Sequence, residues 1–277
     1  MGNVFGGCRG QAVEETYDLT FNEDKPDFFL GYMNETEVEI GDKTKITDDT
    51  YSGPHIYGSV YGGGQDGHVR RGTNVIVNKA EIGIPYTTAN RTLLKTLPAS
   101  PTPEQISSTA DLDDLEWLHR GNIYGGGSGI GKYEESSVMK NSPSAGSVNH
   151  STTVEVKGGI IHRNVYGGGS LASVCPPTAY GGNVPSKTGT PGMVSLNTVT
   201  ISGTIGTPTG YNPVYGGEVY GASRGDKNLD PVMFAVSVWT QVNIQKGAHI
   251  MGNVFGGGDS GKVLKDTNVV IGEETTP

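Results

Sequence analysis

The chain has 277 residues, of which 44 are glycine and 15 proline, and its formal net charge at pH 7 is −9. Glycine at about 16% of the residues excludes a helical bundle, and the lack of a glycine at every third position excludes collagen. An acidic chain offers nucleic acid no Lys/Arg surface, and no apolar run is long enough to span a membrane as a helix. Because Val and Ile number 42 against 12 Leu, we expect an all-β protein.

Two short motifs alternate along the chain. The first is [Val/Ile]-[Tyr/Phe]-Gly-Gly, which begins at Val4, Val60, Ile123, Val165 and Val254, with a variant pair at Val214 and Val219. The second is [Thr/Asn]-x-Val-x-[Val/Ile], which occupies 36–40, 73–77, 152–156, 197–201, 240–244 and 267–271. Their spacing defines a minimal unit of about 26–27 residues, the length of one solenoid coil. The repetition predicts a parallel β-solenoid of about six coils, and we expect a right-handed β-helix.

Strand alternation assigns an inside and an outside to the second motif. Thr73, Val75 and Val77 share one face, while Asn74 and Ile76 share the other. The first face is Thr/Asn, Val and Val/Ile in all six copies, which suits a narrow apolar interior built by stacking. We read the glycine runs of the first motif as corners that need positive φ and close backbone approach. No helix or Lys follows them as in a phosphate-binding loop.

One aromatic residue holds the same position in each unit, which predicts a ladder of stacked rings along the solenoid. If the preceding Val points inward, each ring points outward and is exposed beside glycine. Two interpretations follow, namely a stack that stabilises neighbouring coils and a platform that contacts sugar faces. The candidate ligand-binding residues are Phe5, Tyr61, Tyr124, Tyr166, Tyr220 and Phe255.

Insertions interrupt a single solenoid domain that spans 1–277. Within the largest, Thr102 followed by Pro103 resembles a helix start, and leucines at threefold spacing indicate one short helix. The others are rich in Gly, Pro or Ser and predict loops. Because Met-Gly-Asn-Val-Phe-Gly-Gly at 1–7 recurs at 251–257, we expect a fragment of a longer repeat protein. The insertions are 9–33, 43–55, 80–118, 132–150, 175–193 and 222–235.

No constellation of residues predicts catalysis or a metal site. Histidines precede the first motif at different offsets, so we expect no coordinated row of His55, His119, His162 and His249. Calcium is the only metal suggested by the acidic clusters, which lie at Glu14-Glu15, Glu23-Asp24, Asp48-Asp49 and 111–116. The turn that contains Asp259 is not a repeated calcium site, because the equivalent turn of another unit has Ser128 in its place. We therefore expect no cofactor and a solvated acidic surface. Cys8 and Cys175 lie in distant coils and are expected to be free thiols.

Catalysis on such a solenoid requires paired carboxylates with a Lys or Arg base on one face. No such cluster recurs at one coil position, so we expect a protein that is not an enzyme. The alternative is a polysaccharide-active β-helix enzyme, a lyase or a hydrolase.

The motifs also carry a resemblance to a protein group. Gly-Asn-Val-Phe-Gly-Gly-Gly and His-Arg-Asn-Val-Tyr-Gly-Gly-Gly, paired with Thr-Asn-Val-Val-Ile-Gly, resemble large glycine-rich surface proteins of gut Bacteroidetes and related anaerobes. These proteins look like adhesins and have no catalytic motif. The resemblance implies an extracellular or cell-surface repeat segment whose partner is a host or bacterial surface glycan or protein. Repeats cut at both termini additionally predict open strand edges and end-to-end self-association.

Overall fold

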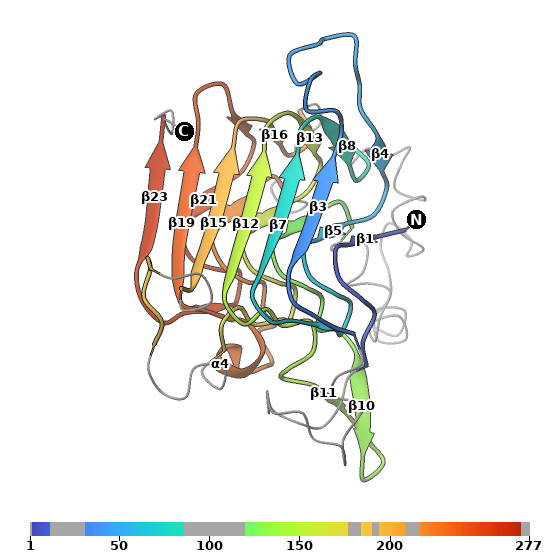
Figure 1. Cartoon of the computed structure of the whole chain (residues 1–277), viewed down its shortest axis with the longest axis vertical. Helices are drawn as coiled ribbons and strands as arrows, with labels where there is room; N and C mark the ends of the chain where they lie inside the picture. The colour runs from blue at the N-terminus through green and yellow to red at the C-terminus, as the bar shows by residue number, and fades with distance from the viewer. Residues whose placement is uncertain are drawn as a thin grey trace, which may run out of the picture.

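The computed structural model describes residues 2–11, 31–85, 120–176, 184–189, 194–208 and 216–272. These residues form a parallel β-solenoid (Figure 1). It has three parallel sheets, and each of coils 1 to 5 contributes one strand to each sheet in turn. The predicted fold class, all-β with a stack of six coils, is confirmed.

The first motif builds one sheet and the second motif another. We call them the aromatic sheet and the threonine sheet. The aromatic sheet contains β1 (Val4–Phe5), β5 (Val60–Tyr61), β9 (Ile123–Tyr124), β14 (Val165–Tyr166), β17 (Val219–Tyr220) and β21 (Val254–Phe255). The threonine sheet contains β3 (Thr36–Ile40), β7 (Gly72–Val77), β12 (Ser151–Val156), β15 (Leu196–Ile201), β19 (Trp239–Ile244) and β23 (Thr267–Ile271).

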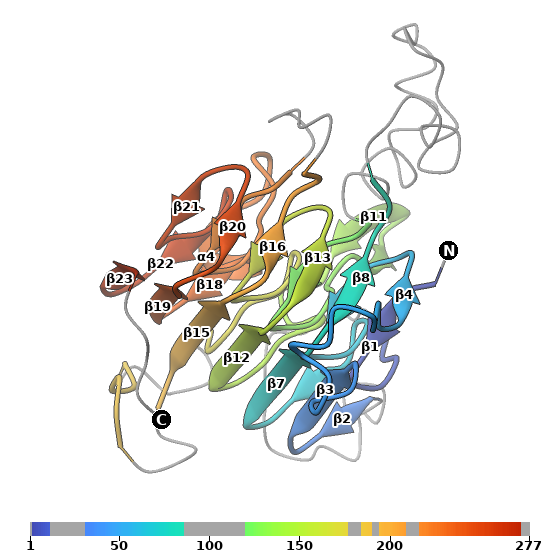
Figure 2. The same cartoon turned by 90° about the horizontal axis from the view of Figure 1, so that it is seen from above.

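A third sheet, which the sequence motifs did not reveal, closes each coil; we call it the isoleucine sheet (Figure 2). Coil 1 therefore runs through β1, β3 and β4, later coils repeat this order, and coil 6 contributes β21 and β23. The isoleucine strands are β4 (His55–Ile56), β8 (Ala80–Ile82), β13 (Gly159–Ile161), β16 (Thr204–Ile205) and β20 (His249–Ile250).

The apolar core lies between the three sheets. The threonine strands pair in register, with Val154 opposite Val75 on one side and Val199 on the other. These valines are fully buried, as are Val60 of the aromatic sheet and Ile82 of the isoleucine sheet. Burial alternates along β7, β15 and β19, as the period of a strand requires. The predicted inward face of the second motif is confirmed.

Threonine hydroxyls tie the threonine sheet of one coil to the aromatic sheet of the next. Thr73 of coil 2 donates to the carbonyl oxygen of Gly125 in coil 3 at 2.5 Å, and Thr152 of coil 3 donates to Gly167 of coil 4 at 2.5 Å. Thr36 and Thr240 make the same contact at 2.6 Å. The hydrogen bond explains why the two motifs occur together, since each supplies one of its partners.

The glycine runs differ from the expectation in one respect. The first glycine of the run does not have positive φ; it permits close approach of the next coil. A Cβ on Gly125 would lie 2.2 Å from the carbonyl oxygen of Gly167, and a Cβ on Gly62 would lie 2.2 Å from that of Gly125. Any side chain at these positions would separate the coils.

Several insertion boundaries also differ from the prediction. Residues 80–82 form β8 of the isoleucine sheet and belong to the regular coil. The 132–150 segment, expected to be a loop, contains the antiparallel hairpin β10 (Lys132–Glu135) and β11 (Val138–Asn141), which projects from the solenoid (Figure 1). The 222–235 segment contains one helical turn, α4 (Pro231–Phe234), capped by Asp230. The helix predicted near Thr102 lies outside the described residues.

A second column of short strands and bridges runs beside the aromatic sheet. It comprises β2 (Tyr32–Met33) paired with β6 (His68–Val69), then bridges through Val148 and Val174, then β18 (Val236–Ser237) paired with β22 (Lys262–Val263). Val69, Val148 and Val174 form a small apolar cluster with Met33. Both cysteines are free, and burial raises the pKa of the Cys175 thiol to about 11. Within the described ranges no helix has the length and apolar character to cross a bilayer.

Candidate functional site

The aromatic ladder is the site that the sequence singles out, and its register follows directly from the aromatic sheet. Neighbouring strands place Tyr61 opposite Tyr124 and Tyr124 opposite Tyr166. The five successive ring pairs have centroid separations of 4.7–5.0 Å and interplanar angles of 3–13°. This spacing equals the distance between paired strands, so each ring lies flat on the next. The predicted ladder from Phe5 to Phe255 is confirmed.

The expected exposure of these rings is wrong for the four tyrosines. Tyr124 is 0% exposed, Tyr166 2%, Tyr61 5% and Tyr220 8%, whereas Phe255 at the end of the stack is 41% exposed. Each tyrosine has both ring faces covered by its neighbours. Ser170 and Arg224, which belong to a row of bridges through Gln65 and Ser128, lie beside the hydroxyl of Tyr124. A sugar therefore has no free tyrosine face on which to stack.

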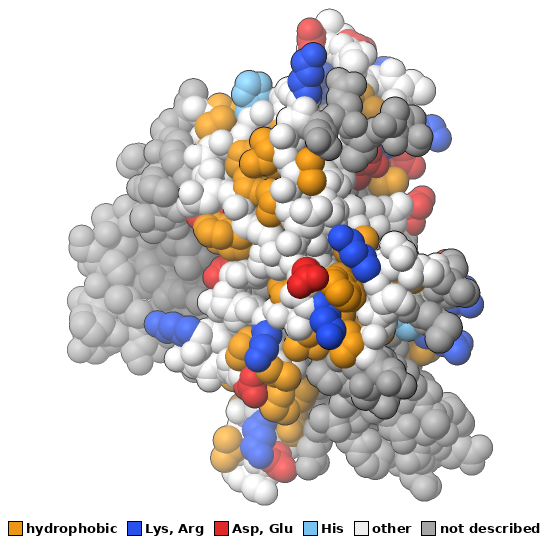
Figure 3. Space-filling view, turned by 90° about the vertical axis from the view of Figure 1, so that its left-hand side faces the viewer, with side chains coloured by type: hydrophobic (Ala, Val, Ile, Leu, Met, Phe, Trp, Pro, Cys, Tyr) orange, Lys and Arg blue, Asp and Glu red, His pale blue; other side chains and the backbone are white. Residues whose placement is uncertain are grey.

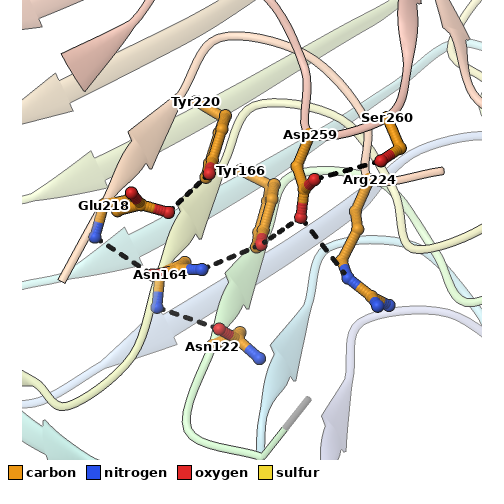
Figure 4. Close-up of polar contacts among 8 residues, drawn as sticks. All are labelled: Asn122, Asn164, Tyr166, Glu218, Tyr220, Arg224, Asp259 and Ser260. Atoms are coloured by element: carbon orange, nitrogen blue, oxygen red, sulfur yellow. Dashed lines mark hydrogen bonds and ion pairs between the residues drawn. The ribbon is translucent and has the colours of Figure 1, made fainter. Parts of the chain in front are cut away.

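The hydroxyl end of the ladder meets a polar cluster of residues that precede the tyrosines and residues that follow the glycine runs (Figure 4). Tyr166 accepts a hydrogen bond from Asn164 Nδ2 at 2.9 Å and donates to Asp259 Oδ2 at 3.5 Å. The same Asp259 oxygen lies 3.8 Å from Arg224 Nε. Tyr220 donates to Glu218 Oε2 at 2.5 Å. The phenols of Tyr166 and Tyr220 thus each reach a carboxylate acceptor at the polar edge of an otherwise apolar stack.

The electrostatics of the cluster keep the phenols protonated. Burial raises the pKa of Tyr124, and it raises that of Tyr166 well above its ordinary value. The pKa of Tyr220 is raised by burial and then by the neighbouring Glu218 carboxylate. Protonated phenols serve as hydrogen-bond donors and cannot act as general bases near neutral pH. The arrangement therefore suits cohesion of the stack better than proton abstraction.

A ladder of polar side chains precedes the aromatic residues and was missed in the sequence. In coils 1 to 4 the side chain of the residue before the first motif accepts a hydrogen bond from the backbone N–H of its counterpart in the next coil. Asn122 Oδ1 accepts from Asn164 N at 2.9 Å, and Asn164 Oδ1 accepts from Glu218 N at 3.0 Å. Asn3 Oδ1 accepts from Ser59 N at 2.8 Å in the same way. The recurring Asn before Val-Phe or Val-Tyr was the signal that could have revealed it.

Two histidines for which the sequence predicted no shared site both contact Glu81 of β8. His162 Nε2 lies 2.9 Å from Glu81 Oε1, and His55 Nδ1 lies 3.8 Å from Glu81 Oε2. His162 Nδ1 lies 3.1 Å from Thr207 Oγ1, so a carboxylate, an imidazole and a hydroxyl follow one another. His162 is 3% and Thr207 5% exposed, and burial lowers the pKa of His162. These contacts link neighbouring coils; His162 and Thr207 are buried there, whereas the Glu81 side chain is 39% exposed.

The remaining candidate metal-binding residues do not come together in one site. Asp48 accepts from the backbone and hydroxyl of Thr50, and these hydrogen bonds lower the pKa of its carboxyl group. Asp259 is occupied by Tyr166, Arg224 and Ser260. Across the described ranges no group of three or more His, Cys, Asp or Glu is arranged to hold a metal ion. His119 and the acidic clusters at Glu14-Glu15, Glu23-Asp24 and 111–116 lie outside the described residues.

Comparison with known proteins gives the solenoid no relative. No family model matches the chain. No curated protein and no solved structure matches it either.

Proposed function

We propose that this chain is a non-enzymatic structural repeat module, a stiff spacer within an extracellular adhesin or cell-surface fibre. The observation that carries the proposal is the use of the recurring side chains. In the aromatic, asparagine and threonine ladders, the recurring side chains stack on or hydrogen-bond to the neighbouring coil. The same contacts are repeated from coil to coil, which supports a role of the chain in holding a rigid shape.

Recognition by such a module would fall to elements that project from the coils. The β10–β11 hairpin is the described element best suited to this, because it stands clear of the solenoid (Figure 1) and exposes Val138 by 57% and Met139 by 58%. The buried tyrosines are not part of the proposed contact with a surface glycan or protein. Location at the cell surface is supported by the resemblance of the repeats to adhesin-like proteins.

The alternative, a polysaccharide-active enzyme, would have to use Glu81, His162 and Thr207, the one described carboxylate–imidazole–hydroxyl group in which both imidazole nitrogens are engaged. The burial of His162 and Thr207 argues against this use. The deciding experiment incubates the purified chain with acidic and neutral polysaccharides and measures new reducing ends and unsaturated products. We expect none above a protein-free control. Products that form with the native chain and disappear with Glu81→Gln would overturn the proposal.

A further inference from the structure

The four inner positions of the aromatic ladder are all tyrosine, although a stack of rings needs no hydroxyl group. Coils 2 to 5 contribute Tyr61, Tyr124, Tyr166 and Tyr220, all of them buried. No hydrogen bond of ordinary geometry reaches the hydroxyl of Tyr124 from the described residues, although Ser170 and Arg224 lie beside it. A buried hydroxyl without a partner costs free energy, and phenylalanine would stack equally well without that cost. Ring stacking alone therefore does not account for the phenol.

The four tyrosine rings are close and parallel enough for their π-electron systems to interact. The ring centroids of Tyr61 and Tyr124 lie 4.8 Å apart, as do those of Tyr124 and Tyr166, and those of Tyr166 and Tyr220 lie 4.9 Å apart. The angles between successive ring planes are 8°, 7° and 3°. An electron moves between such rings more readily than through the same length of saturated side chain. The tyrosines thus form a continuous path of oxidisable groups from coil 2 to coil 5.

Tyr220 is the member of this path that is best placed to release a proton. Loss of one electron makes a phenol strongly acidic, so its oxidation requires a nearby proton acceptor. Tyr220 donates to Glu218 Oε2 at 2.5 Å, whereas the contact of Tyr166 with Asp259 Oδ2 is longer, at 3.5 Å (Figure 4). Burial and then the Glu218 carboxylate raise the pKa of Tyr220, so its proton stays in place until an electron leaves.

We propose that the tyrosine stack passes single electrons to an external one-electron oxidant, and that the resulting radical is localised on Tyr220. In this step one electron leaves Tyr220 through the stack and reduces the oxidant by one unit of charge. The phenolic O–H bond breaks, and the proton moves to Glu218 Oε2, which becomes a carboxylic acid. Return of one electron and of this proton restores the phenol. The activity goes beyond the proposed structural role and does not depend on it.

The burial of Tyr220 determines how long such a radical lasts. Radicals on exposed tyrosines disappear when two rings from different molecules meet and couple. Tyr220 is 8% exposed, and its ring lies between those of Tyr166 and Phe255, so it is shielded from such encounters. Tyr57 is 49% exposed and has no such protection. A long-lived tyrosyl radical is therefore the expected signature of the stack.

The exposed thiol of Cys8 allows an oxidant to be attached at the opposite end of the path. A Cβ on Gly64 of coil 2 would lie 2.3 Å from the Cys8 carbonyl oxygen, so Cys8 lies beside coil 2. Cys175 is buried and its thiol pKa is about 11, so a thiol reagent labels Cys8 selectively. Figure 3 shows charged side chains of both signs scattered over the face at the coil 6 end, without a patch that would collect a charged oxidant. A tethered oxidant is therefore preferred to a diffusing one.

The test uses the full chain with a ruthenium polypyridyl complex on Cys8, which light and a soluble electron acceptor convert to the oxidising trivalent state. We expect electron paramagnetic resonance to detect a long-lived tyrosyl radical. Tyr220→Phe is expected to abolish it, and Glu218→Gln to lower its yield because the amide is a poor proton acceptor. Tyr124→Phe keeps the ring in the stack but removes an oxidisable group, so most of the yield is expected to be lost. Tyr57→Phe is the matched control and is expected to retain the long-lived radical.

The outcomes separate electron transfer through the stack from a purely structural ladder. Unchanged circular dichroism and melting temperature establish that each variant folds. A labelled native chain without a long-lived radical would overturn the proposal. A radical that persists in Tyr220→Phe would overturn it as well, because the radical would then lie elsewhere. Equal yields from the native chain and Tyr124→Phe would show that the electron does not pass through the stack. None of these results bears on the polysaccharide assay.

Discussion

Thr152 illustrates how single residues hold adjacent coils together. Its hydroxyl is buried and donates to the Gly167 carbonyl at 2.5 Å, while Thr153, the next residue, faces solvent. The same residue type thus has two roles on opposite faces of one strand. Only the inward threonine has a partner that would be left without a donor after substitution.

We predict that Thr152→Val lowers the free energy of unfolding by about 1–3 kcal/mol, because a buried carbonyl loses its hydrogen bond while the side-chain volume is retained. Thr153→Val is the matched control and is expected to change it by less than about 0.5 kcal/mol. Urea denaturation followed by circular dichroism measures both. Equal effects of the two substitutions would contradict a hydrogen-bonded threonine ladder.

Burial of one residue, His68, makes the free energy of unfolding depend on pH. It is 3% exposed, its Nδ1 lies 3.2 Å from Ser147 Oγ, and burial lowers its pKa to about 4. The unfolded chain binds this proton near pH 6.5 and the folded chain does not, so stability is retained above pH 6.5 and declines as the pH falls toward 4.

The expected loss reaches about 3 kcal/mol at the acid limit, from the difference between the two pKa values. We predict that His68→Gln makes the stability curve between pH 6.5 and 4 flatter than that of the native chain, as measured by urea denaturation at successive pH values. A curve with the native slope would show that His68 is not the buried neutral group described here.

At the scale of elements, the glycines that follow the strands of the aromatic sheet set the distance between coils. Gly126 lies so close to coil 4 that a Cβ would fall 2.8 Å from the Gly169 backbone nitrogen, whereas the equivalent Gly257 in coil 6 has nothing within 4 Å of its Cβ position. Position in the stack, and not residue type, decides whether a methyl group fits.

We predict that Gly126→Ala lowers the free energy of unfolding by about 1–3 kcal/mol through overpacking. Gly257→Ala is expected to be neutral or to stabilise the isolated chain by up to about 1 kcal/mol, because it restricts the unfolded state. Thermal and urea denaturation at a concentration where the chain is monomeric compare the two. Similar destabilisation by both would contradict the open end of coil 6.

The elements also show what sequence patterns could predict. The six threonine strands were predictable because Thr152 and Val154 repeat with a period of two and recur in every unit. The isoleucine sheet was not, because its strands are two or three residues long and too short for a period. The ring stack of Tyr124 was predictable from equal spacing. Its burial was not, because the covering residues near Ser170 and Arg224 reach it through long-range folding.

At the scale of the whole molecule, the solenoid is a stack of similar layers with a covered first coil and an open last coil. Val38 in coil 1 is 8% exposed and its counterpart Val269 in coil 6 is 37% exposed. Contacts between coils supply both the core and the polar ladders, so the stack gains stability with each added layer. Most of the recurring contacts thus lie between coils, which agrees with a structural module.

The burial of the aromatic ladder is the central claim, and nitration by tetranitromethane followed by peptide mass spectrometry tests it most directly. Tyr57, which is 49% exposed, is expected to react readily in the folded chain. Tyr124 and Tyr166 are expected to react only after unfolding, because the reagent modifies accessible phenols and their pKa values are raised by burial. Nitration of Tyr124 and Tyr166 in the folded chain at the rate of Tyr57 would contradict the account.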